Sequence, residues 1–125
     1  MKNVLITGGA GYIGSELVGF LLKSGHKVQV LDNMTCGADS LLRYAGNPNF
    51  DFENLDVRQT SDLKKYLSKA DIILPLAALV GFPNCEKKSV EAVQVNFEAN
   101  KWIAENKVTR LRPRREERLS QCQID

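Results

Sequence analysis

Three glycines near the amino terminus have the spacing of a phosphate-binding turn. Gly8, Gly11 and Gly14 follow an apolar run, residues 4–6, and lead into a segment with helical periodicity. Glycine tolerates a positive φ angle in a tight turn, and its missing Cβ lets a ligand approach the backbone closely. Free N–H groups at the start of the following helix attract phosphate. We therefore predict that this turn binds the pyrophosphate of a dinucleotide; a purely structural turn is the alternative.

An aspartate follows the next apolar segment at roughly the distance expected for a ribose ligand. Asp32 comes directly after residues 27–31, which have the composition of a second strand. A carboxylate at this position binds the hydroxyls of an adenosine ribose and repels a 2′-phosphate. We therefore predict NAD as the cofactor, in preference to NADP. The alternative is an aspartate that only stabilises the loop at the end of a strand.

The other residue types that perform chemistry are sparse and scattered. Cys36, Cys85 and Cys122 are odd in number and lack C-x-x-C spacing, so neither a zinc site nor a disulfide framework is predicted. The single histidine, His26, lies in a Ser-Gly-His-Lys turn and is interpreted as a surface loop residue. We expect no metal site.

Length and composition are those of an ordinary globular chain. The 125 residues, 43% hydrophobic and 26% charged, fit one small domain. The net charge of +2 is too small to indicate a polyanionic partner, so nucleic acid is not expected. We find no apolar run of membrane-spanning length, and the chain starts directly with a strand, so neither a membrane partner nor a secretory signal is predicted. The expected location is the cytoplasm.

Strand and helix patterns alternate four times along the chain. Right-handed crossovers between parallel strands then give the spatial order 3-2-1-4, the first half of a doubly wound α/β sheet plus one further strand. The predicted strands are residues 4–6, 27–31, 50–55 and 71–76. The predicted helices are residues 12–23, 38–44, a segment from residue 60 or 61 through 67, and 86–107.

The apolar patterns also predict how these elements are buried. Residues 50–55 alternate, as in an edge strand, whereas residues 70–79 are nearly all apolar, as in a parallel strand buried on both faces. The last part of that run, Leu76, Ala77 and Ala78, lies where ligands bind in open α/β sheets, or is plain core. The first helix carries Ile13, Leu17, Phe20 and Leu21 on one side, and the last carries Val90, Val93 and Phe97.

Five motifs in this order resemble a known family. They are Thr-Gly-Gly-Ala-Gly-Tyr-Ile-Gly at residues 7–14, Leu-Asp-Asn at 31–33, Leu-Asp-Val-Arg at 55–58, Leu-Ala-Ala at 76–78 and Val-Asn at 95–96. Together they resemble the extended short-chain dehydrogenase/reductases, specifically the NAD-dependent epimerase/dehydratase group that acts on nucleotide sugars. The resemblance runs from residue 1 to about residue 101 and implies a Rossmann-like fold.

The resemblance implies a role for each matched position. Asp56 would accept a hydrogen bond from the adenine amino group, with Val57 beside the ring, and residues 76–78 would line the nicotinamide. Asn96 would lie on the helix behind the cofactor. Asp56 as a loop aspartate and Asn96 as a polar residue on a helix face are the alternatives. The complete set implied for NAD is Gly8, Gly11, Tyr12, Ile13, Gly14, Asp32, Asn33, Asp56, Val57, Leu76, Ala77, Ala78 and Asn96, in which Tyr12 and Ile13 contribute backbone amides.

The sequence departs from the family at its catalytic residues. Members use a Ser/Thr and a Tyr-x-x-x-Lys pair, but the residues four positions after Tyr12, Tyr44 and Tyr66 are glutamate, proline and alanine. A fifth strand is also absent, and residues 109–118 are charged and aperiodic instead. No catalytic residue is therefore assigned, and a nucleotide sugar is expected to bind only to an intact relative.

Our expectation from the sequence is a partial NAD-binding domain. Residues 1–106 form a Rossmann-like sheet truncated to about four strands, and residues 107–125 form an irregular basic tail that is predicted to be disordered. The unpaired edge of the fourth strand predicts self-association. Two alternatives remain open: a non-catalytic NAD-binding or interaction module, and an inactive product of a truncated gene.

Overall fold

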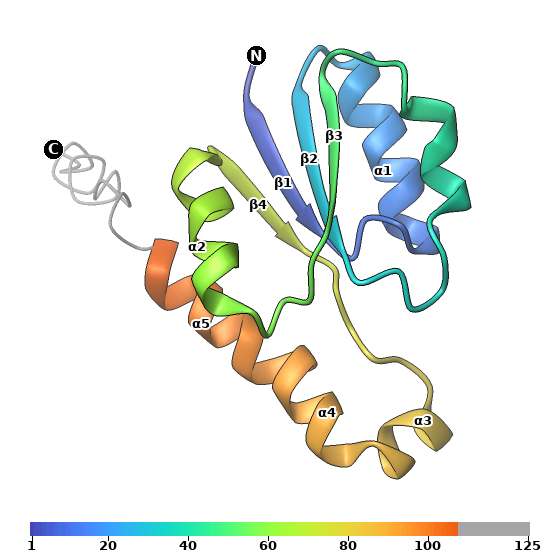
Figure 1. Ribbon diagram of the computed structural model, residues 1–125, viewed down its shortest axis with the longest axis vertical. Coiled ribbons are helices and arrows are strands. Elements are labelled where there is room, and N and C mark those ends of the chain that lie inside the picture. The colour runs from blue at the N-terminus through green and yellow to red at the C-terminus, as the bar shows by residue number, and fades with distance from the viewer. Residues whose placement is uncertain (108–125) are drawn as a thin grey trace, which may run out of the picture.

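The computed structural model describes residues 1–107, which form a four-stranded parallel sheet with helices on both faces (Figure 1). The strand order is β3-β2-β1-β4, so the predicted Rossmann-like order is confirmed. The basic tail that was predicted to be disordered, residues 107–125, lies outside the described residues except for Lys107. The strands are β1 (Asn3–Thr7), β2 (Lys27–Asp32), β3 (Phe50–Asn54) and β4 (Ile72–Pro75).

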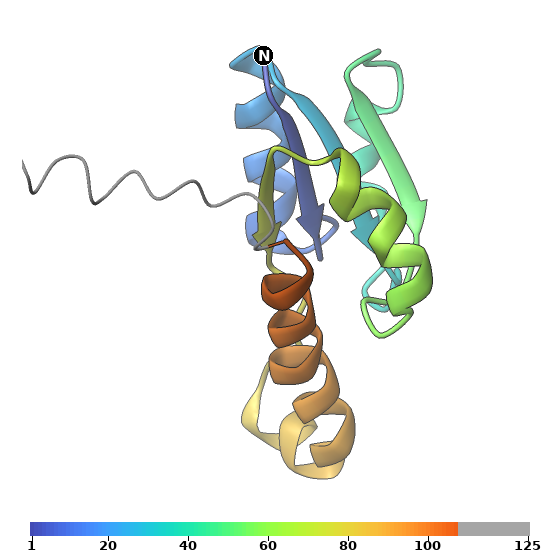
Figure 2. The same cartoon turned by 90° about the vertical axis from the view of Figure 1, so that its left-hand side faces the viewer.

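Two hydrophobic cores form because side chains alternate between the faces of the sheet. Val4 and Ile6 of β1 are buried under α1 (Tyr12–Lys23) and η1 (Asp39–Tyr44), a 3₁₀-helix. Leu5, between them in the sequence, is buried on the opposite face under α2 (Thr60–Lys69) and α5 (Ala99–Lys107). Figure 2 shows α1 and α2 on opposite sides of the strands. The central strand β1 is therefore covered on both faces.

Helix α1 has the predicted bounds, but of the predicted apolar side only Leu17 and Leu21 pack against the core, and both are partly buried. The residues buried against the sheet are Gly14, Ser15, Val18 and Gly19. Ile13 and Phe20, from the predicted apolar side, are 69% and 66% exposed. Small residues allow the helix axis to lie close to the sheet: a Cβ added to Gly14 would lie 2.7 Å from the carbonyl oxygen of Gly8.

The predicted helix 86–107 is divided into several segments. Helix α3 (Phe82–Lys87) precedes α4 (Ser89–Val93), and a π-helical turn, η2 (Gln94–Glu98), joins α4 to α5. Val90, Val93 and Phe97 are exposed rather than packed, within the described residues. The buried residues of this region are Ala99 and Ile103 of α5, which packs beside α2 (Figure 1).

The two edge strands differ in how well the sequence predicted them. β3 lies at an edge of the sheet, as its alternating pattern predicted. β4 was expected to be buried on both faces, but Ile72 is 42% exposed and Ile73 and Leu74 are only partly buried. The reason is that, in residues 1–107, β4 pairs with β1 alone and forms the second edge.

A candidate dinucleotide site at the carboxyl edge of the sheet

The glycine turn connects the end of β1 to the start of α1. Gly8 has a φ angle of +71°, and its N–H donates to the carbonyl oxygen of Leu31 at 2.8 Å. A Cβ added to Gly8 would lie 2.5 Å from the backbone nitrogen of Ala77, in the segment after β4. Both the positive φ angle and this close approach require glycine. The turn therefore lies against the carboxyl ends of both β2 and β4.

The start of α1 is open to an anion. Gly11 is the N-cap residue and provides no side-chain cap, and the first turn of the helix contains no acidic residue. Tyr12 and Ile13, whose backbone amides were predicted to face a pyrophosphate, are both exposed, Tyr12 to 91%. Unpaired N–H groups and the helix dipole make such a terminus attractive to phosphate.

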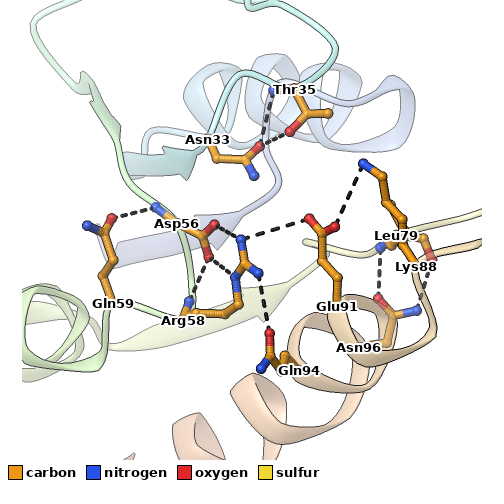
Figure 3. Close-up of polar contacts among 10 residues, drawn as sticks. All are labelled: Asn33, Thr35, Asp56, Arg58, Gln59, Leu79, Lys88, Glu91, Gln94 and Asn96. Atoms are coloured by element: carbon orange, nitrogen blue, oxygen red, sulfur yellow. Dashed lines mark hydrogen bonds and ion pairs between the residues drawn. The ribbon is translucent and has the colours of Figure 1, made fainter. Parts of the chain in front are cut away.

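Asp32, at the end of β2, is bonded to the glycine turn. Its Oδ2 accepts a hydrogen bond from the N–H of Ala10 at 3.0 Å, and its Oδ1 accepts one from the N–H of Met34 at 2.8 Å. A carboxylate offers about four acceptor positions, so the two oxygens retain capacity for ribose hydroxyls. The neighbouring Asn33 accepts hydrogen bonds from the N–H and the hydroxyl of Thr35, which order the next loop (Figure 3).

Asp56 lies in the loop after β3, and its carboxylate is held by Arg58. Arg58 Nε donates to Oδ1 at 2.9 Å and Nη2 donates to Oδ2 at 2.6 Å (Figure 3). These hydrogen bonds to Arg58 are the main cause that lowers the pKa of Asp56, and the Asn33 side chain adds to the effect. Val57, the other residue predicted to contact adenine, is 6% exposed, so little of its side chain is open to a ligand.

The segment after β4 is bonded to Thr7, a residue to which the sequence assigned no role of its own. The Leu76 N–H donates to the carbonyl oxygen of Thr7 at 2.9 Å, and the Ala77 N–H donates to its Oγ1 at 3.4 Å. Thr7 is completely buried. Its hydroxyl extends the pairing of β1 and β4 beyond Pro75 and fixes residues 76–78, which were predicted to line the nicotinamide. A threonine directly before the glycine turn is the signal that would have indicated this.

Asn96 uses its side-chain amide on the backbone of Leu79. Its Oδ1 accepts from the Leu79 N–H at 2.7 Å, and its Nδ2 donates to the Leu79 carbonyl oxygen at 2.9 Å (Figure 3). The structure thus places Asn96 against the chain that follows residues 76–78. The predicted residues gather at the carboxyl ends of four strands, where ligands bind in open α/β sheets.

Comparison with known proteins assigns the family. Residues 4–114 match the model of the NAD dependent epimerase/dehydratase family. The chain belongs to this family. A UDP-N-acetyl-alpha-D-glucosaminuronate decarboxylase of Bacillus cytotoxicus is 32% identical over 102 residues, which are 82% of this chain and 32% of that protein. The chain spans about a third of the length of that curated relative.

Solved structures of nucleotide-sugar enzymes share the fold of this epimerase/dehydratase family member. The UDP-Glc/GlcNAc 4-epimerase of Campylobacter jejuni superposes with a TM-score of 0.77 at 28% identity, covering 85% of this chain and 33% of that one. The dTDP-glucose 4,6-dehydratase DesIV of Streptomyces venezuelae, solved with NAD bound, has a TM-score of 0.75 at 26% identity. The match covers 83% of this chain and 35% of that one. These similarities confirm the predicted family and fold.

Tyr44 and Tyr66 of this epimerase/dehydratase chain lie outside the predicted NAD site. Tyr44 donates its hydroxyl to the carbonyl oxygen of Ser15 at 3.0 Å, against α1. Burial raises the pKa of Tyr66, and the carboxylate of Glu53 raises it further. Tyr66 borders a cavity of about 320 Å³ that is also lined by Asn3, at the amino end of the sheet. A raised pKa disfavours the tyrosinate form, which is the form that would act as the base when a hydride is removed from an alcohol.

Two further properties concern the described part of the chain. Residues 1–107 contain no group of three or more His, Cys, Asp or Glu side chains that would hold a metal ion. Over the same residues, every helix is too short or too polar to cross a membrane.

Proposed function

We propose that this chain binds NAD at the carboxyl edge of its sheet, as the cofactor portion of a nucleotide-sugar epimerase/dehydratase. The observation that carries the proposal is the uncapped start of α1 beside Asp32. The open N–H groups supply the pyrophosphate site, and the carboxylate that bonds to Ala10 supplies the ribose site. The NAD dependence of the family and the NAD bound in the DesIV structure support this choice of cofactor.

The other predicted residues extend this site along the cofactor. Asp56 would bind the amino group of adenine, and residues 76–78 would lie beside the nicotinamide. Gly8 and Gly14 keep the turn close to the backbone of neighbouring segments, which leaves the space in front of the helix to the pyrophosphate. NAD lacks a 2′-phosphate, so the negative charge of Asp32 does not oppose it.

The test of cofactor choice is calorimetric titration with NAD and NADP. NAD should bind more tightly, and Asp32→Asn should bring the two dissociation constants together, because it removes the charge that repels the 2′-phosphate. Asp51→Asn, a matched change on the exposed part of β3, should leave the ratio unchanged. NADP binding that equals or exceeds NAD binding in the unmodified chain would contradict the proposal.

A pair of glycine variants separates binding from folding. A Cβ added to Gly11 meets one atom within 4 Å, the Gly8 oxygen at 3.3 Å, whereas one added to Gly14 meets backbone at 2.7 Å. Gly11→Ala should therefore keep most of the stability and weaken NAD binding, because the methyl group enters the predicted phosphate site. Gly14→Ala should lower stability itself. Unchanged NAD affinity in a folded Gly11→Ala variant would contradict the assignment of the pyrophosphate to this turn.

We also propose that these 125 residues by themselves turn over no nucleotide sugar. Hydride removal from an alcohol needs a base within hydrogen-bond reach, and the sequence contains no Tyr-x-x-x-Lys pair. Assays with NAD and UDP-, GDP-, CDP- and dTDP-sugars should show no product. Turnover that is abolished by Tyr12→Phe, Tyr44→Phe or Tyr66→Phe would contradict this statement. A non-catalytic NAD-binding module is the second candidate, favoured by the absence of a Tyr-x-x-x-Lys pair from the sequence.

Self-association and a cytoplasmic location complete the proposal. Ile72 at the free edge of β4 and Val90 and Phe97 beyond it expose apolar surface, which favours association. Light scattering should detect oligomers, and a single monomeric species at all concentrations would contradict this.

The proposed cytoplasmic location is tested by cell fractionation. Recovery of the protein in the membrane or secreted fraction would contradict it.

A further inference from the structure

Arg58 connects the predicted adenine site to the helix that follows β4. On one side, its main-chain N–H and its Nε both donate to Asp56 Oδ1 at 2.9 Å, and Nη2 donates to Oδ2 at 2.6 Å. On the other side, Nη1 donates to Gln94 Oε1 at 3.4 Å and Nη2 lies 3.8 Å from Glu91 Oε1 (Figure 3). One guanidinium therefore contacts both its own loop and Gln94, which is 36 residues further along the sequence.

The two carboxylate oxygens of Asp56 accept different numbers of hydrogen bonds from Arg58. Oδ1 accepts two hydrogen bonds from Arg58, which fills its usual capacity of about two. The Asn33 side chain also interacts with this carboxylate. Oδ2, which accepts the Nη2 hydrogen bond, is the oxygen with acceptor capacity left for a ligand. A planar, two-point contact of this kind also fixes the plane of the carboxylate. Without it, an Asp56 side chain that is 21% exposed would be held mainly by the main-chain N–H of residue 58.

We propose that Arg58 is a positioning residue that presents Oδ2 of Asp56 to the 6-amino group of adenine and couples this contact to α4 and η2. The inference rests on the proposed NAD site and adds the residue that sets the preference for the adenine base.

The guanidinium contacts with α4 and η2 lie beside a cavity. This cavity, of about 360 Å³, is lined by Val57, Arg58, Gln94 and Trp102 among others. Glu91 is itself held by Lys88, whose Nζ lies 3.7 Å from Oε2. The same helical region carries Asn96, which holds Leu79. Base recognition and the predicted nicotinamide segment thus depend on one helical region.

The experiment compares NAD with nicotinamide hypoxanthine dinucleotide, which carries a carbonyl oxygen in place of the 6-amino group. The unmodified chain should bind NAD about tenfold more tightly, as expected for a hydrogen bond to a charged group. Arg58→Gln should reduce this ratio to about threefold or less, mainly by weakening NAD binding, because the carboxylate loses both guanidinium hydrogen bonds and keeps only the one from the main-chain N–H. Arg58→Lys, which keeps the charge without the planar fork, should fall between them. Lys65→Gln, which removes an exposed cation of α2 that pairs with Asp62, should leave the ratio unchanged.

Two further variants test the coupling of the Asp56 contact to α4 and η2. Glu91→Gln and Gln94→Ala leave Asp56 and Arg58 intact, and each should lower the ratio by a smaller factor than Arg58→Gln. If Arg58→Gln does not fold by circular dichroism, Arg58→Lys and these two variants decide the matter. Ratios unchanged in both helix variants would overturn the coupling.

The remaining outcomes are distinguishable from one another. No NAD binding to the unmodified chain would overturn the proposed function together with this inference. NAD binding without preference over the hypoxanthine analogue would overturn only the assignment of Asp56 and Arg58. A preference that survives in folded Arg58→Gln, or in full in Arg58→Lys, would show that Asp56 needs no planar partner and would overturn the role of Arg58 alone.

Discussion

The side-chain amide of Asn96 pairs with both main-chain groups of Leu79, as an adjacent β-strand would. The two hydrogen bonds, 2.7 Å and 2.9 Å long, connect the π-helical turn η2 to the chain after β4. Because residues 76–78 are also bonded to Thr7, this segment is fixed from both ends. Its position at the predicted nicotinamide site is therefore set by hydrogen bonds to its own main-chain groups from Thr7 and Asn96.

Replacement of Asn96 should release Leu79. Asn96→Ala removes two hydrogen bonds and should lower the free energy of unfolding by about 1–2 kcal/mol, with faster amide exchange at Leu79. Asn100→Ala is the matched control, because Asn100 donates only to the Asn96 carbonyl oxygen of its own helical region. Urea denaturation and hydrogen exchange measure both effects. Equal losses in the two variants, or an unchanged Leu79 exchange rate, would argue against this role.

Gly19 and Tyr44 should be energetically coupled. A Cβ added to Gly19 would lie 2.4 Å from the Tyr44 hydroxyl, which donates to the Ser15 carbonyl oxygen at 3.0 Å. Gly19→Ala should therefore cost about 1–3 kcal/mol. In the Tyr44→Phe background the same change should cost less, although not nothing, because Cζ would still lie 3.2 Å away. A double-mutant cycle by thermal unfolding measures the coupling; simple additivity would refute it.

Lys107 should stabilise the end of α2. Its ammonium donates to the carbonyl oxygens of Leu67, at 2.9 Å, and of Ala70. A cation at a helix C-terminus also interacts favourably with the helix dipole. Lys107→Met, which keeps most of the apolar stem, should lower the free energy of unfolding by about 1 kcal/mol.

The control for Lys107 is another lysine of α5. Lys101 makes only a long contact of 3.9 Å with Glu105, and both side chains are exposed. Lys101→Met should change stability by less than about 0.5 kcal/mol. Urea denaturation of both variants tests the prediction, which fails if the two losses are alike.

The Asp56–Arg58 pair should contribute to the acid sensitivity of the fold. Hydrogen bonds from Arg58 hold the pKa of Asp56 below its usual value. The contribution is therefore present above the unfolded pKa of about 3.9 and is lost as the pH falls through the lower folded pKa. Arg58→Gln should raise the Asp56 pKa and reduce this part of the acid destabilisation. Carbon-13 titration of the carboxyl group, with Arg43→Gln as the control, measures the shift; no rise in Arg58→Gln would disprove the cause.

The fold was predictable from the sequence because strand and helix patterns alternate with short connections. The order β3-β2-β1-β4 follows from that alternation and the handedness of crossovers. The buried side of α1 was not predictable in the same way. Gly14 and Gly19 contribute almost nothing to hydrophobic periodicity, yet they let the helix approach the sheet and η1, which leaves Ile13 and Phe20 exposed.

The candidate site was predictable where function depends on backbone geometry and less so where it depends on side-chain contacts. The spacing of the glycine turn and Asp32 can be recognised in the sequence, and the structure brings the two together. The assignment of these residues to NAD stays a prediction. The contacts of Arg58 with Gln94 and of Asn96 with Leu79 join residues far apart in the chain. They also depend on a π-helical turn that periodicity does not reveal.

That π-helical turn sets the rotational phase of the helical region between β4 and residue 107. A π turn accommodates one more residue than an α turn, and one residue corresponds to a rotation of about 100° in an α-helix. Glu91 and Gln94, before or at the start of η2, lie at Arg58, while Ala99 and Ile103, after it, are buried beside α2. Winding Gln94–Glu98 as a regular α-helix of the same length would turn these two sets by about 100° relative to each other. The π winding of this turn therefore keeps the contacts with Arg58 and the core contacts in register.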